Sequence, residues 1–121
     1  MLTKKEFDKI FNKYFGLLND LYMVTVANVV GNSNKIALSK PYLASRIANS
    51  LLEVEQIALT PHLTEECRRV IIEKTLEYFA EFFDQVTQKD RLVAFAKRQI
   101  DSPRAPLRIK AKTLLKKWNY I

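Results

Sequence analysis

The chain has 121 residues, of which 48% are hydrophobic and 27% charged, a composition that excludes disorder and a length that suits one domain with a buried core. Only two glycines are present, which disfavours β-sandwiches and dinucleotide-binding folds and excludes a Gly-rich phosphate loop. The net charge of +7 is uneven, because residues 89–121 carry ten Lys or Arg against two Asp, whereas residues 1–88 are close to neutral.

The first predicted helix extends from about residue 3 to about residue 30. Thr3 and Glu6 form a capping-box pattern, and apolar residues recur from Phe7 onward at three- and four-residue steps. Residues 22–30 are rich in β-branched side chains and are also compatible with a strand, but their valines keep the helical step. Gly31 suits the position after a helix end, so residues 31–34 (Gly-Asn-Ser-Asn) are expected to form a turn.

Two further helices are predicted in the middle of the chain. Ser39 followed by Pro41 opens the first of them, and Thr60, which precedes another proline, ends it. Thr64, followed by two glutamates, caps the next helix, where acidic residues suit the helix dipole. This helix carries four aromatic residues on its apolar stripe and is therefore expected at the centre of the core: Tyr78, Phe79, Phe82 and Phe83.

Two shorter helices complete the predicted fold. Asp90 is expected to cap a helix that reaches about residue 100, and residues 101–106, with two prolines, form a rigid link to a last helix over about residues 107–119. A step of 100° per residue places four apolar side chains of the last helix on one face: Leu107, Ala111, Leu114 and Trp118. We therefore expect an all-α fold, a compact bundle of about five helices that forms a single helical domain over residues 1–121.

The side chains that usually carry chemistry are scarce. His62 is the only histidine and lies in a predicted turn, and Cys67 is the only cysteine, which excludes an internal disulfide and indicates a reducing compartment. Cys67 is expected to be a small core residue; the alternative is a reactive thiol near a helix N-terminus, beside two arginines. Glu73, Glu77 and Glu81 are expected to form a solvated ridge, since no histidine accompanies them as a metal ligand. No metal, cofactor or catalytic residue is expected, and the protein is not expected to be an enzyme.

The basic C-terminal quarter is the main candidate for function. Arg108, Lys112 and Lys116 share one ridge of the last helix, because they are four residues apart. Clustered Lys and Arg suit phosphate binding, an acidic protein or an anionic membrane surface, but they also suit a terminal helix that only stays hydrated. The candidate partner- or nucleic-acid-binding residues are Lys97, Arg98, Arg104, Arg108, Lys112, Lys116 and Lys117.

Two stretches resemble parts of known families. Residues 111–118 (Ala-Lys-Thr-Leu-Leu-Lys-Lys-Trp) resemble the closing helix of the TFIIS N-terminal (LW) domain, although the upstream Leu-Arg-Lys-His pattern of that family is absent here. Residues 92–118 are alternatively similar to a single HEAT-like helical hairpin, in which two antiparallel helices flank an Asp/Pro corner and an aliphatic-Arg pair, here Leu107 and Arg108, opens the second helix. Both resemblances imply a binding scaffold without catalysis.

These observations together predict a non-enzymatic helical interaction module, a scaffold or adaptor with a protein partner. The first resemblance implies transcription or another nucleic-acid process as its setting. The alternative is direct nucleic-acid binding through the basic C-terminal helices, and a homo-oligomer is a further open alternative. No apolar run reaches the length of about 18 residues that a membrane span needs, and no secretory leader is visible, so we expect no membrane span and an intracellular location, cytoplasmic or nuclear.

Overall fold

The computed structural model describes residues 3–19 and 23–120, and nearly all of them are helical or lie in short connections. The α-helices are α1 (Lys4–Phe15), α2 (Met23–Ser39), α3 (Ala44–Leu51), α4 (Glu65–Phe82), α5 (Lys89–Lys97) and α6 (Ala105–Lys117). Short 3₁₀ segments lie beside them: η1 (Gly16–Asn19), η2 (Pro41–Leu43), η3 (Leu52–Gln56) and η4 (Phe83–Gln85). These residues contain no strand, only an isolated bridge between Thr60 and Leu63. The expected all-α bundle is confirmed, with six α-helices where about five were expected.

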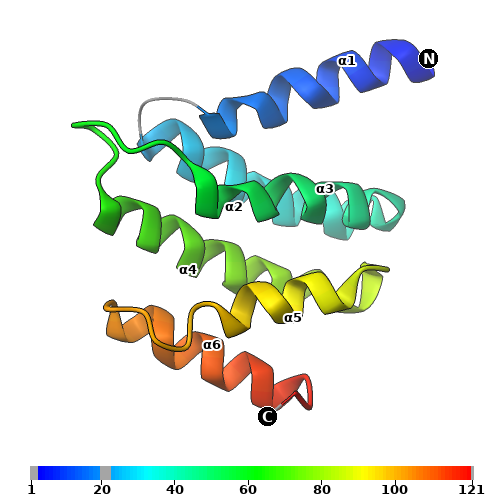
Figure 1. Cartoon of the computed structure of the whole chain (residues 1–121). Helices are drawn as coiled ribbons and strands as arrows, with labels where there is room; N and C mark the ends of the chain where they lie inside the picture. Colours follow the sequence, from blue (N-terminus) through cyan, green and yellow to red (C-terminus); the bar gives the residue numbers. More distant parts are fainter. Residues whose placement is uncertain (1–2, 20–22, 121) are drawn as a thin grey trace.

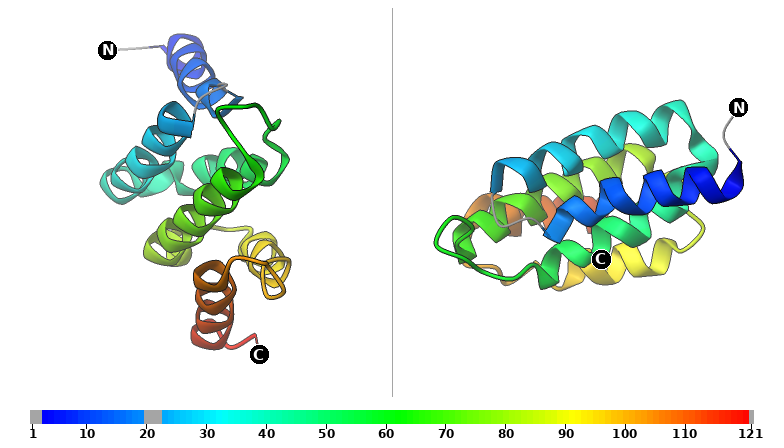
Figure 2. Two further views of the ribbon diagram at one scale, coloured as in Figure 1. Left: turned by 90° about the vertical axis from the view of Figure 1, so that its left-hand side faces the viewer. Right: turned by 90° about the horizontal axis from the view of Figure 1, so that it is seen from above.

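The helices are stacked from α1 at one end of the molecule to α6 at the other (Figures 1 and 2). α4 lies in the middle, where it packs against α2 on one side and α6 on the other. α3 and α5 lie next to this row, and side chains from the start of α5, Gln88 and Arg91, donate hydrogen bonds to Asn49 of α3. The stack leaves α1 and α6 as its two terminal helices.

Side-chain caps fix the start of two helices. The Thr3 hydroxyl accepts the backbone N–H of Glu6 at 3.1 Å at the start of α1. The Thr64 hydroxyl accepts the backbone N–H of Cys67 at 3.2 Å at the start of α4. Each cap satisfies a helix N–H that has no partner within the helix and contributes about 1 kcal/mol. Both caps are confirmed predictions.

A left-handed residue ends α6. Asn119 has a φ of 65°, and the backbone N–H groups of Asn119 and Tyr120 donate to carbonyls in the last turn of α6 at 3.1 and 2.8 Å. This hydrogen-bond pattern is the Schellman motif, in which asparagine is tolerated just after the helix end. Trp118, at the C-cap, turns inward and stacks on Phe83 with 4.2 Å between the ring centroids.

The first predicted helix is in fact two helices. α1 ends at Phe15, η1 follows it, and α2 begins at Met23; the expected helix across residues 20–22 lies outside the described residues. The expected turn at residues 31–34 is wrong, because α2 continues through it to Ser39 and Gly31 does not have a positive φ.

Tertiary packing explains why residues 31–34 are helical. Val30, Ser33 and Ala37 of α2 are completely buried at helical spacing, and α2 packs along α4. The buried Ser33 hydroxyl donates to the Val29 carbonyl at 2.7 Å, so it needs no turn to find a partner. Burial of this stripe outweighs the poor helix propensities of residues 31–34, which cost about 1 kcal/mol or less per residue.

Other boundaries differ by a few residues. The expected second helix is divided between η2, α3 and η3 and ends at Gln56, before Thr60. Asp90 lies in the first turn of α5 and is not its cap, a position that Gln88 holds. α5 ends earlier than expected, and α6 begins at Ala105, with a proline in its first turn, where the missing N–H costs nothing.

The predicted aromatic centre of the core is confirmed. Phe79 and Phe82 of α4 are completely buried and meet edge to face, and Phe95 of α5 meets Phe79 in a similar way. Tyr78 and Phe83 are partly buried against the same core. Each fully buried aromatic ring contributes about 2–3 kcal/mol to stability. α6 packs against both α4 and α5, the two helices that carry these rings.

Candidate interaction surface

The candidate basic residues do not form one surface. Arg98 is engaged in an ion pair with another part of the chain. Its guanidinium donates to both oxygens of the Glu55 carboxylate, with a shortest N–O distance of 2.6 Å. Gln99 donates to the same carboxylate at 2.8 Å. These hydrogen bonds to Glu55 raise the pKa of Arg98. Arg98 therefore fastens the end of α5 to η3, and its charge is already matched.

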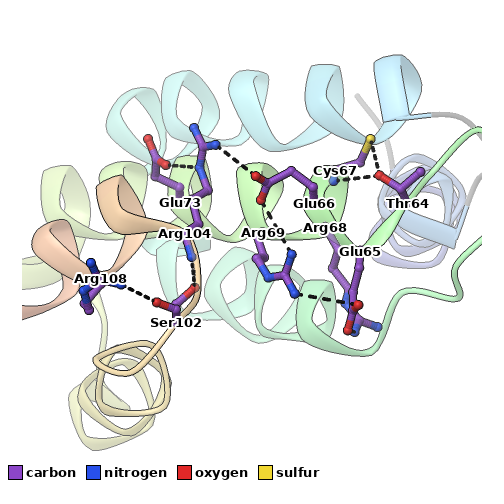
Figure 3. Close-up of polar contacts among 10 residues, drawn as sticks. All are labelled: Thr64, Glu65, Glu66, Cys67, Arg68, Arg69, Glu73, Ser102, Arg104 and Arg108. Atoms are coloured by element: carbon purple, nitrogen blue, oxygen red, sulfur yellow. Dashed lines mark hydrogen bonds and ion pairs between the residues drawn. The ribbon is translucent and has the colours of Figure 1, made fainter.

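Arg104 is also matched, by the glutamates of α4 (Figure 3). Its Nε donates to Glu73 Oε1 at 2.7 Å, and its Nη1 lies 3.6 Å from Glu66 Oε2. The hydrogen bond to Glu73 raises the pKa of Arg104. Lys110 of α6 adds contacts of 3.2 Å to Glu77 and 3.9 Å to Glu73. The expected solvated ridge is wrong for Glu73, whose side chain is 15% exposed, because Arg104, just before α6, and Lys110 of α6 supply its cations.

Arg108 closes the corner between α5 and α6 (Figure 3). Its Nη1 donates to the Ser102 carbonyl at 2.8 Å, and the Ser102 hydroxyl accepts the backbone N–H of Arg104 at 3.2 Å. The other four candidates are exposed, and no carboxylate of the described residues pairs with them: Lys97, Lys112, Lys116 and Lys117. Of the seven candidate residues, these four lysines are therefore the ones available to a partner.

An apolar hollow of about 590 Å³ lies between α4 and α6. Nearly all of its surface is apolar, and it is lined by Glu77, Ala80, Ala105, Pro106, Ile109, Lys110, Thr113 and Leu114. The face of α6 predicted to point inward does so, and all four of its apolar residues are buried. Ile109 lies on another side of α6 and is 61% exposed. A large apolar side chain at the edge of an apolar hollow is typical of a binding groove.

Charges of opposite sign border this groove. On the α6 side, Lys112 and Lys116 follow Ile109 by three and seven residues and share its side of the helix. On the α4 side, the exposed Glu81 lies one turn beyond Glu77. A helix lying in the groove would therefore meet cations along one flank and carboxylates along the other.

Cys67 lies at the start of α4. It was expected to be a buried core residue, but it is only half-buried against the core. The Thr64 hydroxyl donates to its Sγ at 3.2 Å, and this hydrogen bond lowers the pKa of the thiol. The two neighbouring arginines pair with Glu65 instead of the thiol (Figure 3). His62 is exposed in the turn between Thr60 and Leu63, as expected.

Metal-ligating side chains do not gather anywhere over residues 3–19 and 23–120. There, no group of three His, Cys, Asp or Glu side chains is placed to hold a metal ion. None of the described helices is long and apolar enough to cross a membrane. Comparisons with known protein families, characterised proteins and solved structures find no match to this chain.

Sequence reasoning found the helix that carries the groove but not the groove itself. Ile109 was the available signal, because it is an apolar residue between Arg108 and Lys110, on the side of the helix away from the buried stripe. The side of the groove that α4 forms depends on how α6 packs against α4. That packing involves contacts between residues about thirty positions apart, such as Arg104 with Glu73. Periodicity along one helix cannot predict such a pairing.

Proposed function

We propose that this protein is a non-enzymatic helical interaction module, a scaffold or adaptor that docks an amphipathic helix of a partner protein between α4 and α6. The observation that carries the proposal is the apolar groove with Ile109 exposed at its edge. Helix-in-groove recognition needs this combination of an apolar floor and an anchor residue that loses water on binding. Both family resemblances of the C-terminal region imply a scaffold of the same general kind.

The charges along the groove define the partner's chemistry. The α6 side offers Lys112 and Lys116, whereas the α4 side offers Glu81, since Glu77 already pairs with Lys110. A complementary helix carries apolar residues at three- and four-residue steps, acidic residues along one flank and basic residues along the other. Such charges act mainly on specificity and association rate, and the apolar contact supplies most of the affinity.

Direct nucleic-acid binding is the alternative function, and the four available lysines are its support. Phosphate binding is rewarded by each cation that is free to displace counterions. Arg98 and Arg104 already pair with carboxylates. The exposed Glu81, one turn beyond the groove residue Glu77, would repel a phosphate backbone. Trp118 is stacked on Phe83 and does not offer its free face to a base. These contacts favour the protein partner.

Three designed peptides test the proposal. Each has about 18 residues, enough to form a helix in water, and a leucine stripe. The two-sign peptide has glutamates on one flank and lysines on the other; the all-acidic and all-basic peptides have one charge on both flanks. We expect the two-sign peptide to bind most tightly to the α4–α6 groove. Exchanging the two flanks is not a useful control, because a helix can reverse its direction in the groove.

Two matched substitutions locate the binding. Ile109→Ser removes the groove's anchor, and Ile10→Ser removes a similarly exposed isoleucine from α1. Burying an isoleucine contributes about 1.5–3 kcal/mol. Ile109→Ser should therefore lower the affinity for the two-sign peptide about tenfold or more, and Ile10→Ser should leave it unchanged. Equal affinities for all three proteins would contradict the proposal. A gel shift with duplex or single-stranded nucleic acid, strongest at low salt and lost in Lys112→Ala/Lys116→Ala, would favour the alternative.

A further inference from the structure

A second apolar hollow, of about 230 Å³, lies at the opposite end of the stack, between α1, the end of α2 and η2. Its surface is also almost entirely apolar, and it is lined by Phe7, Ile10, Phe11, Tyr14, Phe15, Ile36, Lys40 and Leu43. Phe11 and Phe15 form a buried floor, with ring centroids 4.5 Å apart, whereas Ile10 at the edge is 54% exposed. Like Ile109, Ile10 is a large apolar residue left at the edge of a hollow by a terminal helix.

The underside of this hollow is firmly held. Arg46 of α3 places its guanidinium 4.0 Å from the centroid of the Phe11 ring and pairs with Asp8 at 2.8 Å. This contact uses the one aspartate of α1 and fixes α1 against α3. The hollow is therefore formed on a helix that is held against α3, and the carboxylate of Asp8 is already paired with Arg46.

Basic residues dominate the borders of this hollow. Lys40, just after α2, lines it directly. Lys13 of α1 is not a lining residue but lies three residues beyond Ile10, one helical turn away at the border. Both are exposed, and no carboxylate of the described residues pairs with either. Of the two acidic residues of α1, Asp8 pairs with Arg46, and Glu6 accepts a hydrogen bond from the Thr3 hydroxyl at the helix cap. This border differs from that of the α4–α6 groove, where the exposed Glu81 lies one turn beyond the lining residue Glu77.

We propose that the hollow between α1 and α2 is a second docking site, which takes an amphipathic helix with acidic residues on both flanks from another protein. The apolar floor accepts the helix's apolar stripe, and Lys13 and Lys40 pair with its flanking Asp or Glu. This site is independent of the α4–α6 groove. If both sites are occupied, the chain holds two helices at opposite ends of its stack, which is the geometry of an adaptor.

The charges of the chain itself argue against a second copy as the occupant. The free face of α6 carries Lys112 and Lys116, so end-to-end stacking of two copies would bring lysines against Lys13 and Lys40. A concave floor also fits a protein helix better than a lipid surface, since membrane binding uses an apolar face that projects into the bilayer. The charge complement and the shape thus select the same occupant.

The test uses the full chain and the all-acidic and all-basic peptides, with affinities measured by fluorescence anisotropy. We expect the all-acidic peptide to bind at least tenfold more tightly than the all-basic one, roughly, since several exposed pairs each change from attraction to repulsion. Lys13→Glu/Lys40→Glu should reverse this preference, whereas the control Lys97→Glu/Lys117→Glu, at two exposed lysines outside both docking sites, should keep it. Ile10→Ser should weaken the all-acidic peptide and Ile109→Ser should not. Circular dichroism checks that every variant is folded, which the exposed positions favour.

Each contrary result overturns the proposal. Equal binding of both peptides, or none, shows that the lysine border selects nothing. Loss of the all-acidic peptide in Ile109→Ser but not in Ile10→Ser assigns it to the other groove. Binding of phosphatidylserine vesicles without binding of the peptide, lost in Lys13→Glu/Lys40→Glu, assigns the border to a membrane surface. Concentration-dependent self-association in light scattering, lost in Ile10→Ser, assigns it to a second copy.

Discussion

Replacing Gly31 with alanine tests the course of α2 through residues 31–34. Gly31 lies inside α2 without a positive φ. A Cβ added there would meet the Tyr78 hydroxyl oxygen at 3.7 Å, an ordinary van der Waals distance, and no closer atom outside its own helix. The methyl group therefore fits without displacing a neighbour.

The magnitude follows from the difference between glycine and alanine in a helix. Glycine costs about 0.5–1 kcal/mol relative to alanine in a helix interior, because its unfolded backbone is freer. Since no strain offsets this gain, Gly31→Ala should raise the free energy of unfolding by about 0.7 kcal/mol and the melting temperature by about 3 °C. If Gly31 were a left-handed turn residue, alanine would instead cost about 1 kcal/mol. The two backbones predict opposite signs.

Urea unfolding followed by far-ultraviolet circular dichroism measures this difference. Gly16→Ala is the matched control, because Gly16 has a φ of −61° at the end of α1 and its Cβ would meet nothing within 4 Å. We expect the control to stabilise by a smaller amount, since a helix end gains less than an interior. A loss of stability in Gly31→Ala, with an unchanged denaturant slope, would refute a helical Gly31.

Three further substitutions test separate contacts. Thr64→Val removes the hydroxyl that lowers the pKa of Cys67, so the iodoacetamide rate profile should move to higher pH, whereas Thr64→Ser should leave it in place; an unmoved profile in the valine variant contradicts the assigned hydrogen bond. Because the pKa of Cys67 is lower in the folded than in the unfolded state, the ionised thiol stabilises the fold at pH values above the unfolded-state pKa. This stabilisation is lost as the pH falls through the folded-state pKa, and it should be smaller in Thr64→Val. Trp118→Ala should cost about 3 kcal/mol in urea unfolding and Trp118→Phe less than half as much, because phenylalanine can still stack on Phe83; equal losses would exclude the stack. Asn119→Gly should stabilise by about 0.5 kcal/mol and Asn119→Ala destabilise, since φ is 65° there, and the opposite order in thermal unfolding would count against the left-handed cap.

The parts of the fold that could be predicted are those set by local chemistry. Thr64 caps α4 as its sequence predicts, and the aromatic stripe of α4 is the centre of the core. The inward side of α6 was also readable, because a fixed step of 100° placed Trp118 with the buried residues. These features depend on neighbours within one or two helical turns, which a single sequence contains.

The errors occurred where distant contacts decide. Residues 31–34 have turn-forming composition, yet the burial of Ser33 and Ala37 along α4 keeps them helical. The glutamate ridge looked solvated because its cations, on Arg104 and Lys110, come from a helix about thirty residues away. The charged C-terminal quarter depends on distant contacts in the same way, since its net charge includes Arg98 and Arg104, which pair with glutamates of other elements.

The most direct test of a docked partner helix is a pulldown with the full chain, with and without nuclease treatment of the lysate. It is run in parallel for wild type, Ile109→Ser and Ile10→Ser. The α4–α6 groove predicts a defined protein that wild type and Ile10→Ser retain after nuclease treatment and that Ile109→Ser loses. Proteins that disappear with nuclease, or that Ile109→Ser retains in full, would contradict a partner held in that groove.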